Sequence, residues 1–512
     1  MKTRNQSGDH SEYSPEVGWL LQWAGAADLS RLAGEFGPVG SLFPHRKRRA
    51  TPSALPLRER LALPLFPNAP IAHLTALEFL FNALSNPVFL PENTFHTHPK
   101  GGLANLLSGA FDLATIYGKT AIQGDLRQQL NRCLVWPWNT SRLSLDDQAP
   151  SGRGDILRLH NVIAQDGAAL SEDWFAALPP LQRALYYADG DLGLNRAIIP
   201  DLRNDQSLLT SQFHRAVISF HNCASAQWDE LQDDKMDRTA LLDRTRRFVT
   251  GALARVILLD ILPRFVDPAA IDWSLQHRAP LYCSAAAMAG TKHILPLEAC
   301  ALIGTLIALH RPASLYPNQA ALTSGNMLRF DDMFAQSPLS GLPNQLFLSP
   351  RVPTRLGPNC LIDWRLFCHP NKALSPAHHG ELFITDNKLL NNSLTLAALA
   401  NFPPAGTCLE AARNSFDQDL PVLTPSHLRQ CAGRTDATAD DAPLMTYVLA
   451  EARVMGKQGR LGPLGSLIVA ETFVGAIQTT MPEFTATDIR SQPTALLLDF
   501  LTMTGQPRVR KE

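Results

Sequence analysis

The chain has 512 residues, of which 45% are hydrophobic and 18% charged, and its formal net charge is -1. This balance is typical of a globular protein, and it creates no overall field that would attract nucleic acid or an anionic membrane. The eight cysteines are scattered without a CxxC pair, and no long apolar stretch follows the basic residues of the N-terminus. We therefore expect a cytoplasmic protein with free thiols, without a nucleic-acid partner and without a membrane span.

Residues 31–480 are predicted to form a single large domain, because no low-complexity linker or internal repeat interrupts them. The N-terminal residues are polar, so we expect a flexible N-terminal segment over 1–30 and a C-terminal tail over 481–512. Between these ends, apolar residues recur mostly with helical rather than alternating spacing. The fold class predicted from this pattern is mainly α.

Three helical regions are predicted in the middle of the chain. Asn204 and Asp205 are candidate caps for a helix with one apolar face. A second helix covers 248–261, and Pro263 should end it. Residues 279–307 are apolar on nearly every face, so we expect a central, buried helical region there.

Two more helices are predicted towards the C-terminus. The apolar spacing of 445–452 indicates an amphipathic helix, and the glycines at 456, 459 and 462 should end it. Pro463 at a helix start opens the next helix, which continues through Val474.

Six stretches carry recognisable motifs in a fixed order. They are 111–118 (FDLATIYG), 196–205 (RAIIPDLRND), 212–222 (QFHRAVISFHN), 258–265 (LLDILPRF), 361–367 (LIDWRLF) and 460–470 (RLGPLGSLIVA). In this order they resemble packing motifs of the animal-type haem peroxidase superfamily, in its bacterial branch. The resemblance implies a haem-peroxidase-like helical fold, with haem as the expected cofactor.

On the distal side of haem, such an enzyme needs an acid–base group and a cation. The resemblance places Ala83 where the distal histidine should be. Arg203 matches the distal arginine of the family's D-x-R-N-D-E motif and is the candidate catalytic residue, while an ion pair with Asp201 or Asp205 is its structural alternative. Gln206 occupies the position of a carboxylate that some relatives join to haem by an ester, and is a candidate haem contact.

On the proximal side, haem iron needs an axial histidine. The segment 280–294 resembles the family's P-x-E-F-S-x-A-A-x-R-F-G-H-S-M, and the ungapped match places Lys292 on the ligand position. His293 follows it and is the candidate axial and metal ligand, with Lys292 as the second candidate; a polar residue at a helix edge is the alternative for both. Segment 396–404 resembles the family's L-A-A-L-N-L-x-R-G, with Ala400 in place of the supporting asparagine and Asn401 one position later.

Two functions follow from these matches. In the first, the chain is a peroxidase-fold protein without ordinary peroxidase activity or haem, with a binding or scaffold role, because Ala83, Lys292 and Ala400 all depart from the pattern. In the second, it is a haem-dependent oxidoreductase or oxygenase with a rearranged site, acting on a small organic or lipid substrate. Here His293 would be the axial ligand and Arg203 the distal cation, and the two would face one another across the cavity. A separate His96-x-His98 pair is expected to be a surface loop rather than a metal site.

Overall fold

The computed structural model describes the larger part of the chain. It covers residues 39–43, 69–85, 87–90, 102–105, 107–118, 201–205, 207–231, 237–330, 361–374, 382–416, 420–432, 440–485 and 496–502, besides short pieces between 135 and 199 and single residues at 333 and 438. The predicted N-terminal segment 1–30, Gln206, His96 and His98 lie outside these residues.

The described residues are mainly helical, as predicted. The α-helices are α4 (Ile71–Asn82), α5 (Ala114–Tyr117), α10 (Leu208–Leu231), α11 (Arg238–Val256), α12 (Pro268–His277), α13 (Pro280–Met288), α14 (Leu297–Leu309), α15 (Gln319–Ser324), α17 (Trp364–Phe367), α18 (Asn387–Leu399), α19 (Ala405–Phe416), α20 (Pro425–Ala432), α21 (Leu444–Met455), α22 (Pro463–Thr480) and α24 (Leu497–Thr502). Short 3-10 helices are η3 (Leu202–Asp205), η5 (Leu262–Arg264) and η8 (Lys457–Gly459), and η4 (Ile257–Ile261) is a π-helix.

Strands in the described residues are short and pair only in twos. β1 (Val39–Gly40) runs parallel to β8 (Leu295–Pro296). The antiparallel pairs are β2 (Pro87–Leu90) with β3 (Gly102–Asn105), β4 (Val135–Trp136) with β5 (Asn139–Leu143), β6 (Tyr187–Ala188) with β7 (Asp191–Leu192), β9 (Arg311–Pro312) with β12 (Phe383–Ile384), and β10 (Ser314–Leu315) with β11 (Leu328–Arg329).

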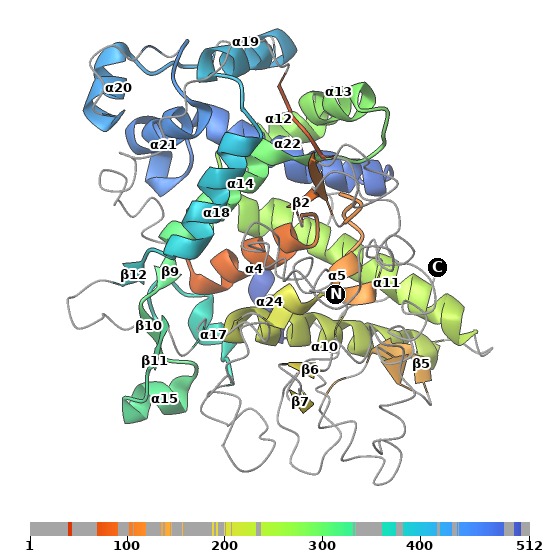
Figure 1. Ribbon diagram of the computed structural model, residues 1–512. Coiled ribbons are helices and arrows are strands. Elements are labelled where there is room, and N and C mark those ends of the chain that lie inside the picture. The colour runs from red at the N-terminus through yellow and green to blue at the C-terminus, as the bar shows by residue number, and fades with distance from the viewer. Residues whose placement is uncertain are drawn as a thin grey trace, which may run out of the picture.

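The helices share one hydrophobic core. In Figure 1, α4 lies between α10 below it and α14 above it, and it packs against both. α14 runs along α18, and α22 lies beside α12, α13 and α21. The described side chains of α4 and α14 are buried at almost every position, so these helices form the centre of the molecule.

Several helix boundaries differ from the sequence prediction. The helix expected after Asn204 and Asp205 is α10, but both residues belong to η3 and do not cap it. Ser207 takes that role, because its Oγ accepts a hydrogen bond from the Thr210 N–H at 3.1 Å. The helix predicted over 248–261 begins ten residues earlier, at Arg238, and its last turns are the π-helix and the 3-10 helix that contains Pro263.

The predicted central helix over 279–307 is two helices. α13 ends at Met288, a turn follows, and α14 starts at Leu297. Only α14 is central, because the end of α13 faces solvent and Met288 is 67% exposed. The prediction was wrong here because an apolar composition does not reveal a turn that contains small residues such as Gly290, whose φ of 68° favours glycine.

The two C-terminal helices are confirmed as α21 and α22. Pro463 occupies the first turn of α22, and the buried Glu451 of α21 accepts hydrogen bonds from the Leu464 and Gly465 N–H groups. One carboxyl group therefore satisfies two of the N–H groups that a helix start leaves without partners. The predicted C-terminal tail contains α24, which rests on α10 with Phe500 stacked on Phe220 at 4.3 Å.

One described helical stretch is long and apolar enough to cross a membrane, by length and composition alone. It covers Lys457–Thr480, with a mean hydropathy of 1.3 over the test window. Inside the protein, 94% of that window is buried, as expected of a helix in the core.

Candidate functional site

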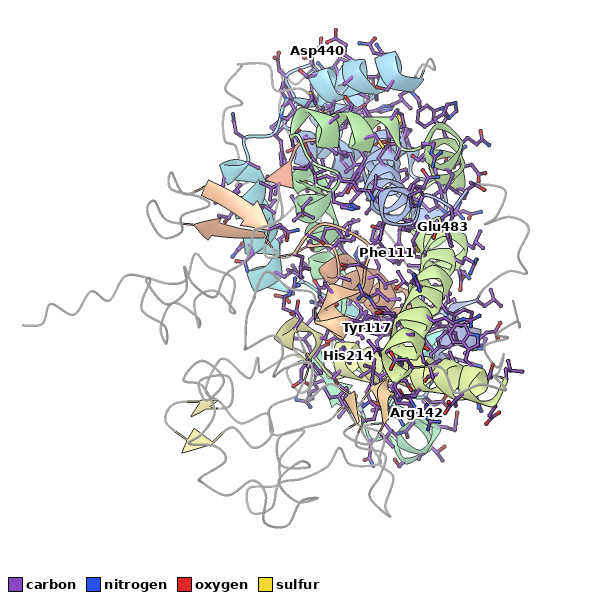
Figure 2. The ribbon with its side chains drawn as sticks, turned by 90° about the vertical axis from the view of Figure 1, so that its right-hand side faces the viewer. Phe111, Tyr117, Arg142, His214, Asp440 and Glu483 are labelled. Atoms are coloured by element: carbon purple, nitrogen blue, oxygen red, sulfur yellow. The ribbon has the colours of Figure 1, made fainter. Side chains whose placement is uncertain are left out.

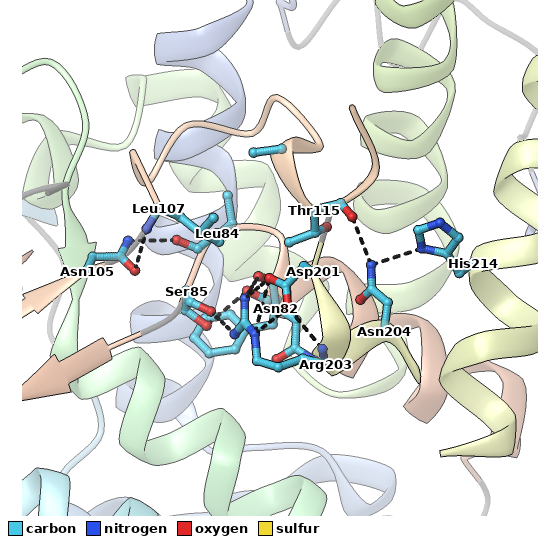
Figure 3. Close-up of polar contacts among 12 residues, drawn as sticks. Asn82, Leu84, Ser85, Asn105, Leu107, Thr115, Asp201, Arg203, Asn204 and His214 are labelled. Atoms are coloured by element: carbon cyan, nitrogen blue, oxygen red, sulfur yellow. Dashed lines mark hydrogen bonds and ion pairs between the residues drawn. The ribbon is translucent and has the colours of Figure 1, made fainter. Parts of the chain in front are cut away.

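Arg203 is held by three groups at the end of α4 (Figure 3). Its Nε donates to both carboxylate oxygens of Asp201, at 3.0 and 3.2 Å, and its Nη2 lies 2.6 Å from Asp201 Oδ2. Nη2 also donates to the Asn82 carbonyl at 2.9 Å, and Nη1 donates to the Ser85 carbonyl. The guanidinium group therefore neutralises a buried carboxylate and caps the C-terminus of α4, where a cation is favourable.

Ala83 is the buried residue that ends α4. It is the residue after the last helical position, it is 1% exposed, and its N–H donates to the Phe79 carbonyl at 3.2 Å. A buried methyl group cannot accept or release a proton. The position that the resemblance assigns to the distal histidine therefore lacks an acid–base group.

The histidines of the 212–222 motif have structural partners. His214 Nδ1 lies 3.0 Å from Asn204 Nδ2, and His221 Nδ1 lies 2.9 Å from the Tyr117 hydroxyl. Figure 2 labels His214 and also Tyr117, the partner of His221. Burial lowers the pKa of His214 to about 3 and that of His221 to about 4, so both are neutral. Asn222 pairs with both backbone groups of Leu143, and the motif thus joins α10 to β5 and α5.

His293 and Lys292 do not lie on a helix. They follow the turn after α13, with Lys292 exposed and His293 partly buried. His293 Nδ1 lies 3.1 Å from Thr479 Oγ1 at the end of α22, and burial together with the neighbouring Lys292 charge lowers the pKa of His293. The expectation that both residues lie on, or at the edge of, a buried helix is therefore wrong, while a ligand role for His293 stays a prediction.

The helix that meets the asparagine-like segment is α14 rather than α13. α18, which ends at Ala400, packs along α14, and Ser393 of α18 lies against Gly304 of α14. The opening Pro-x-Glu of the proximal motif also occurs at Pro296-Leu297-Glu298, where the glutamate matches. Counting along the motif from this glutamate places Ala308 on the ligand position, so the chain holds a second match to the proximal motif besides the one over 280–294.

Ala400 and Asn401 are not brought to Ala308. The Ala308 carbonyl accepts a hydrogen bond from the Asp386 N–H at 2.8 Å, which is at the opposite end of α18 from Ala400. Asn401 is exposed and has a φ of 50°, as asparagine often does in the turn after a helix. Its role is to end α18.

A buried ion pair links α4 to the residues after α14. Arg311 Nη1 and Nη2 lie 2.6 and 2.8 Å from the two carboxylate oxygens of Glu78, and Arg311 Nε lies 3.6 Å from Asp386 Oδ2. The Glu78 and Arg311 side chains are each 8% exposed. Side chains therefore join α4 directly to the residues that follow the end of α14.

These residues do not fit haem. The positions that the resemblance assigns to the distal and axial histidines are Ala83 and, in the match from Glu298, Ala308, and Arg203 is bonded to a carboxylate and to the end of a helix. Within the described ranges, no three His, Cys, Asp or Glu side chains are grouped as metal ligands. Cys223, Cys283, Cys300, Cys368 and Cys408 are free thiols, as predicted for the cysteines.

No protein-family model and no curated protein matches the sequence. Among solved structures, peroxidase A from Dictyostelium discoideum is similar with a TM-score of 0.47 and 12% identity, over 91% of this chain and 95% of that one. The fatty acid alpha-dioxygenase of Arabidopsis thaliana gives a TM-score of 0.42 and 11% identity, over 93% and 72%. That of Oryza sativa gives 0.43 and 10%, over 98% and 78%. These are distant likenesses in the arrangement of the chain.

Proposed function

We propose that this chain is a peroxidase-fold protein without ordinary peroxidase activity, which serves as a binding or scaffold protein. The observation that carries the proposal is the state of Arg203. A distal cation must be free to stabilise charge as the O–O bond breaks. The guanidinium group of Arg203 is instead divided between Asp201 and the carbonyl groups of Asn82 and Ser85.

The positions around Arg203 support the same proposal. Proton transfer to and from peroxide requires a side chain with a suitable pKa, and Ala83 has none. Axial ligation requires a side-chain atom that donates a lone pair to iron, and the methyl group of Ala308 has none. The contacts that Arg203, Ala83 and Ala308 make are with other parts of the fold.

A haem-dependent oxidoreductase with His293 as its ligand is the second candidate. The Thr479 hydroxyl lies 2.6 Å from the Gly475 carbonyl, which indicates that it donates its proton there. His293 Nδ1 must then carry the proton shared with Thr479, which leaves the lone pair on Nε2. A fixed tautomer of this kind is typical of metal-binding histidines.

Haem titration followed at the Soret band distinguishes the two candidates. The protein is titrated with haemin as wild type, as His293→Ala and as the control His277→Ala, which changes an exposed histidine on α12. We expect no saturable complex in any of the three, and no oxidation of an organic donor by peroxide. A tight wild-type complex that weakens sharply in His293→Ala but not in His277→Ala would establish the oxidoreductase instead.

A further inference from the structure

Residues 39–43 (Val-Gly-Ser-Leu-Phe) lie on the start of α14 as a short extended strap. Val39 and Gly40 pair in parallel with Leu295 and Pro296, the two residues before α14. More than 250 residues separate the strap from the helix, so this contact is tertiary and not a local turn. A parallel addition to a strand edge is a common way for proteins to bind extended peptides.

Glu298, in the first turn of α14, anchors the strap. The Ser41 hydroxyl donates to Glu298 Oε1, and the Leu42 N–H donates to Glu298 Oε2 at 3.3 Å. Glu298 is completely buried, and among the described residues it forms no salt bridge. Burying a carboxyl group without a cation is costly unless hydrogen bonds compensate. Both side-chain oxygens of Glu298 have their partners in the strap.

The strap also fills apolar space. Leu42 is 2% exposed and Phe43 is 1% exposed, and both belong to the main hydrophobic core. Ser41 Oγ also accepts a hydrogen bond from the Phe43 N–H at 3.2 Å and lies 2.9 Å from the Phe43 carbonyl oxygen, so it holds the turn over residues 41–43. The contact thus combines backbone pairing, one polar anchor and two apolar side chains, which is the composition of a peptide-recognition site.

We propose that the start of α14 is a docking groove for an extended peptide with a serine followed by two large apolar residues, and that the chain's own residues 39–43 fill it. The ligand class is a protein segment that pairs with β8, offers a hydroxyl and an N–H to Glu298, and buries the next two side chains. This inference specifies the ligand of the binding role proposed above. Because only two residues of the strap pair with β8, a segment from another protein can compete with it.

Fluorescence anisotropy with a labelled, amidated Val-Gly-Ser-Leu-Phe peptide tests the proposal on the full-length chain. In the wild type, the tethered strap competes at a high effective concentration, so we expect weak binding. Leu42→Asp should expel the strap and tighten peptide binding by at least about tenfold. Adding Glu298→Ala to Leu42→Asp should abolish that binding, and a peptide with alanine for serine and aspartate for phenylalanine should bind to none of the proteins.

A Leu42→Asp variant that keeps its circular dichroism spectrum and a cooperative unfolding transition, yet does not bind the peptide, would overturn the proposal. Should that variant fail to fold, hydrogen exchange of the wild type decides. Amides of Leu42, Phe43 and Leu295 should exchange through local opening, well before the amides of α14. Exchange of the strap only through global unfolding would show that it is a fixed part of the core. Both readouts are independent of haem, so their failure is distinct from failure of the proposed function.

Discussion

Arg203 forms an ion pair with the buried Asp201. The sequence identifies an arginine at the family's distal position, and it also allows an ion pair with Asp201 as the alternative. The structure shows that ion pair, together with two carbonyl groups at the end of α4. A cation that already neutralises a carboxylate with 4% exposure is a structural element. Its loss should therefore affect stability.

We expect Arg203→Met to lower the free energy of unfolding by about 3–5 kcal/mol, because it leaves Asp201 buried without its cation. Urea unfolding at pH 7 measures the change. Arg238→Met is the matched control: its partner Asp229 is at the surface and both side chains are more than a third exposed, so the loss should stay within about 1 kcal/mol. Equal stability of Arg203→Met and wild type would contradict a structural role for Arg203.

Glu451 makes stability depend on pH. Burial raises the pKa of Glu451 from its ordinary 4.5 to about 8, against the lowering effect of the Gly465 and Leu464 N–H groups. Between these values the folded protein keeps a proton that the unfolded chain has lost, so stability should fall as pH rises from 4.5 to 8. Glutamine retains an acceptor oxygen without the charge. Glu451→Gln should therefore gain stability relative to wild type at pH 8, on the order of a few kcal/mol, but not at pH 4.5.

Thermal unfolding at both pH values checks this prediction, with Glu410→Gln as the control. Glu410 is an exposed residue of α19, and its substitution should leave the pH profile unchanged. A Glu451→Gln profile parallel to that of the wild type would show that the titration of Glu451 does not contribute.

At the scale of elements, hydrophobic periodicity predicted those helices that have one apolar face. α10, α11 and α21 all appear near their predicted positions. α22 is buried on nearly every face, and its start was predicted from Pro463. Periodicity carries no information where every face is apolar, so α13 and α14 were predicted as one helical region. The π-helix η4 was not predicted either. It contains Asp260, which lies 3.3 Å from His73 Nε2 and accepts a hydrogen bond from the Leu497 N–H at 2.9 Å.

The packing of α13 on α22 gives a prediction at this scale. A Cβ atom at Gly475 of α22 would overlap the ring of Tyr282, which is completely buried on α13. Gly475→Ala should therefore destabilise the protein by about 1–3 kcal/mol through overpacking, although alanine favours helix by about 1 kcal/mol. Gly251→Ala on α11 is the control, since its Cβ would meet Phe484 at an ordinary 3.7 Å and should be neutral or stabilising.

Chemical denaturation of the two alanine variants separates these effects. If both gained similar stability, the contact between Gly475 and Tyr282 would be looser than the structure indicates, and helix propensity alone would determine the outcome.

At the scale of the whole molecule, the sequence predicted a mainly α fold but not the long-range connections between its helices. The motif resemblance alone assigns Ala83 to the distal-histidine position. The pairing of Glu78 with Arg311 joins residues 233 positions apart, and neither lies in a motif that distinguishes it from a surface charge. Such a pair becomes visible only when the helices are packed. The same holds for Glu298, whose partners in the strap lie more than 250 residues away.

The last prediction concerns the Glu78–Arg311 pair, which connects α4, the segment after α14 and, through Asp386, the start of α18. Glu78→Ala removes the carboxylate that both Nη atoms of the buried Arg311 contact, and we expect it to cost about 3–5 kcal/mol. Replacing both partners by apolar residues of similar size, as in Glu78→Leu with Arg311→Met, removes both buried charges together. Its cost should be smaller than that of Glu78→Ala alone, because an apolar pair needs no hydrogen bonds. Urea unfolding of Glu78→Ala and of the double variant measures the two costs. A double variant less stable than Glu78→Ala would show that the ion pair contributes more to the fold than an apolar contact can.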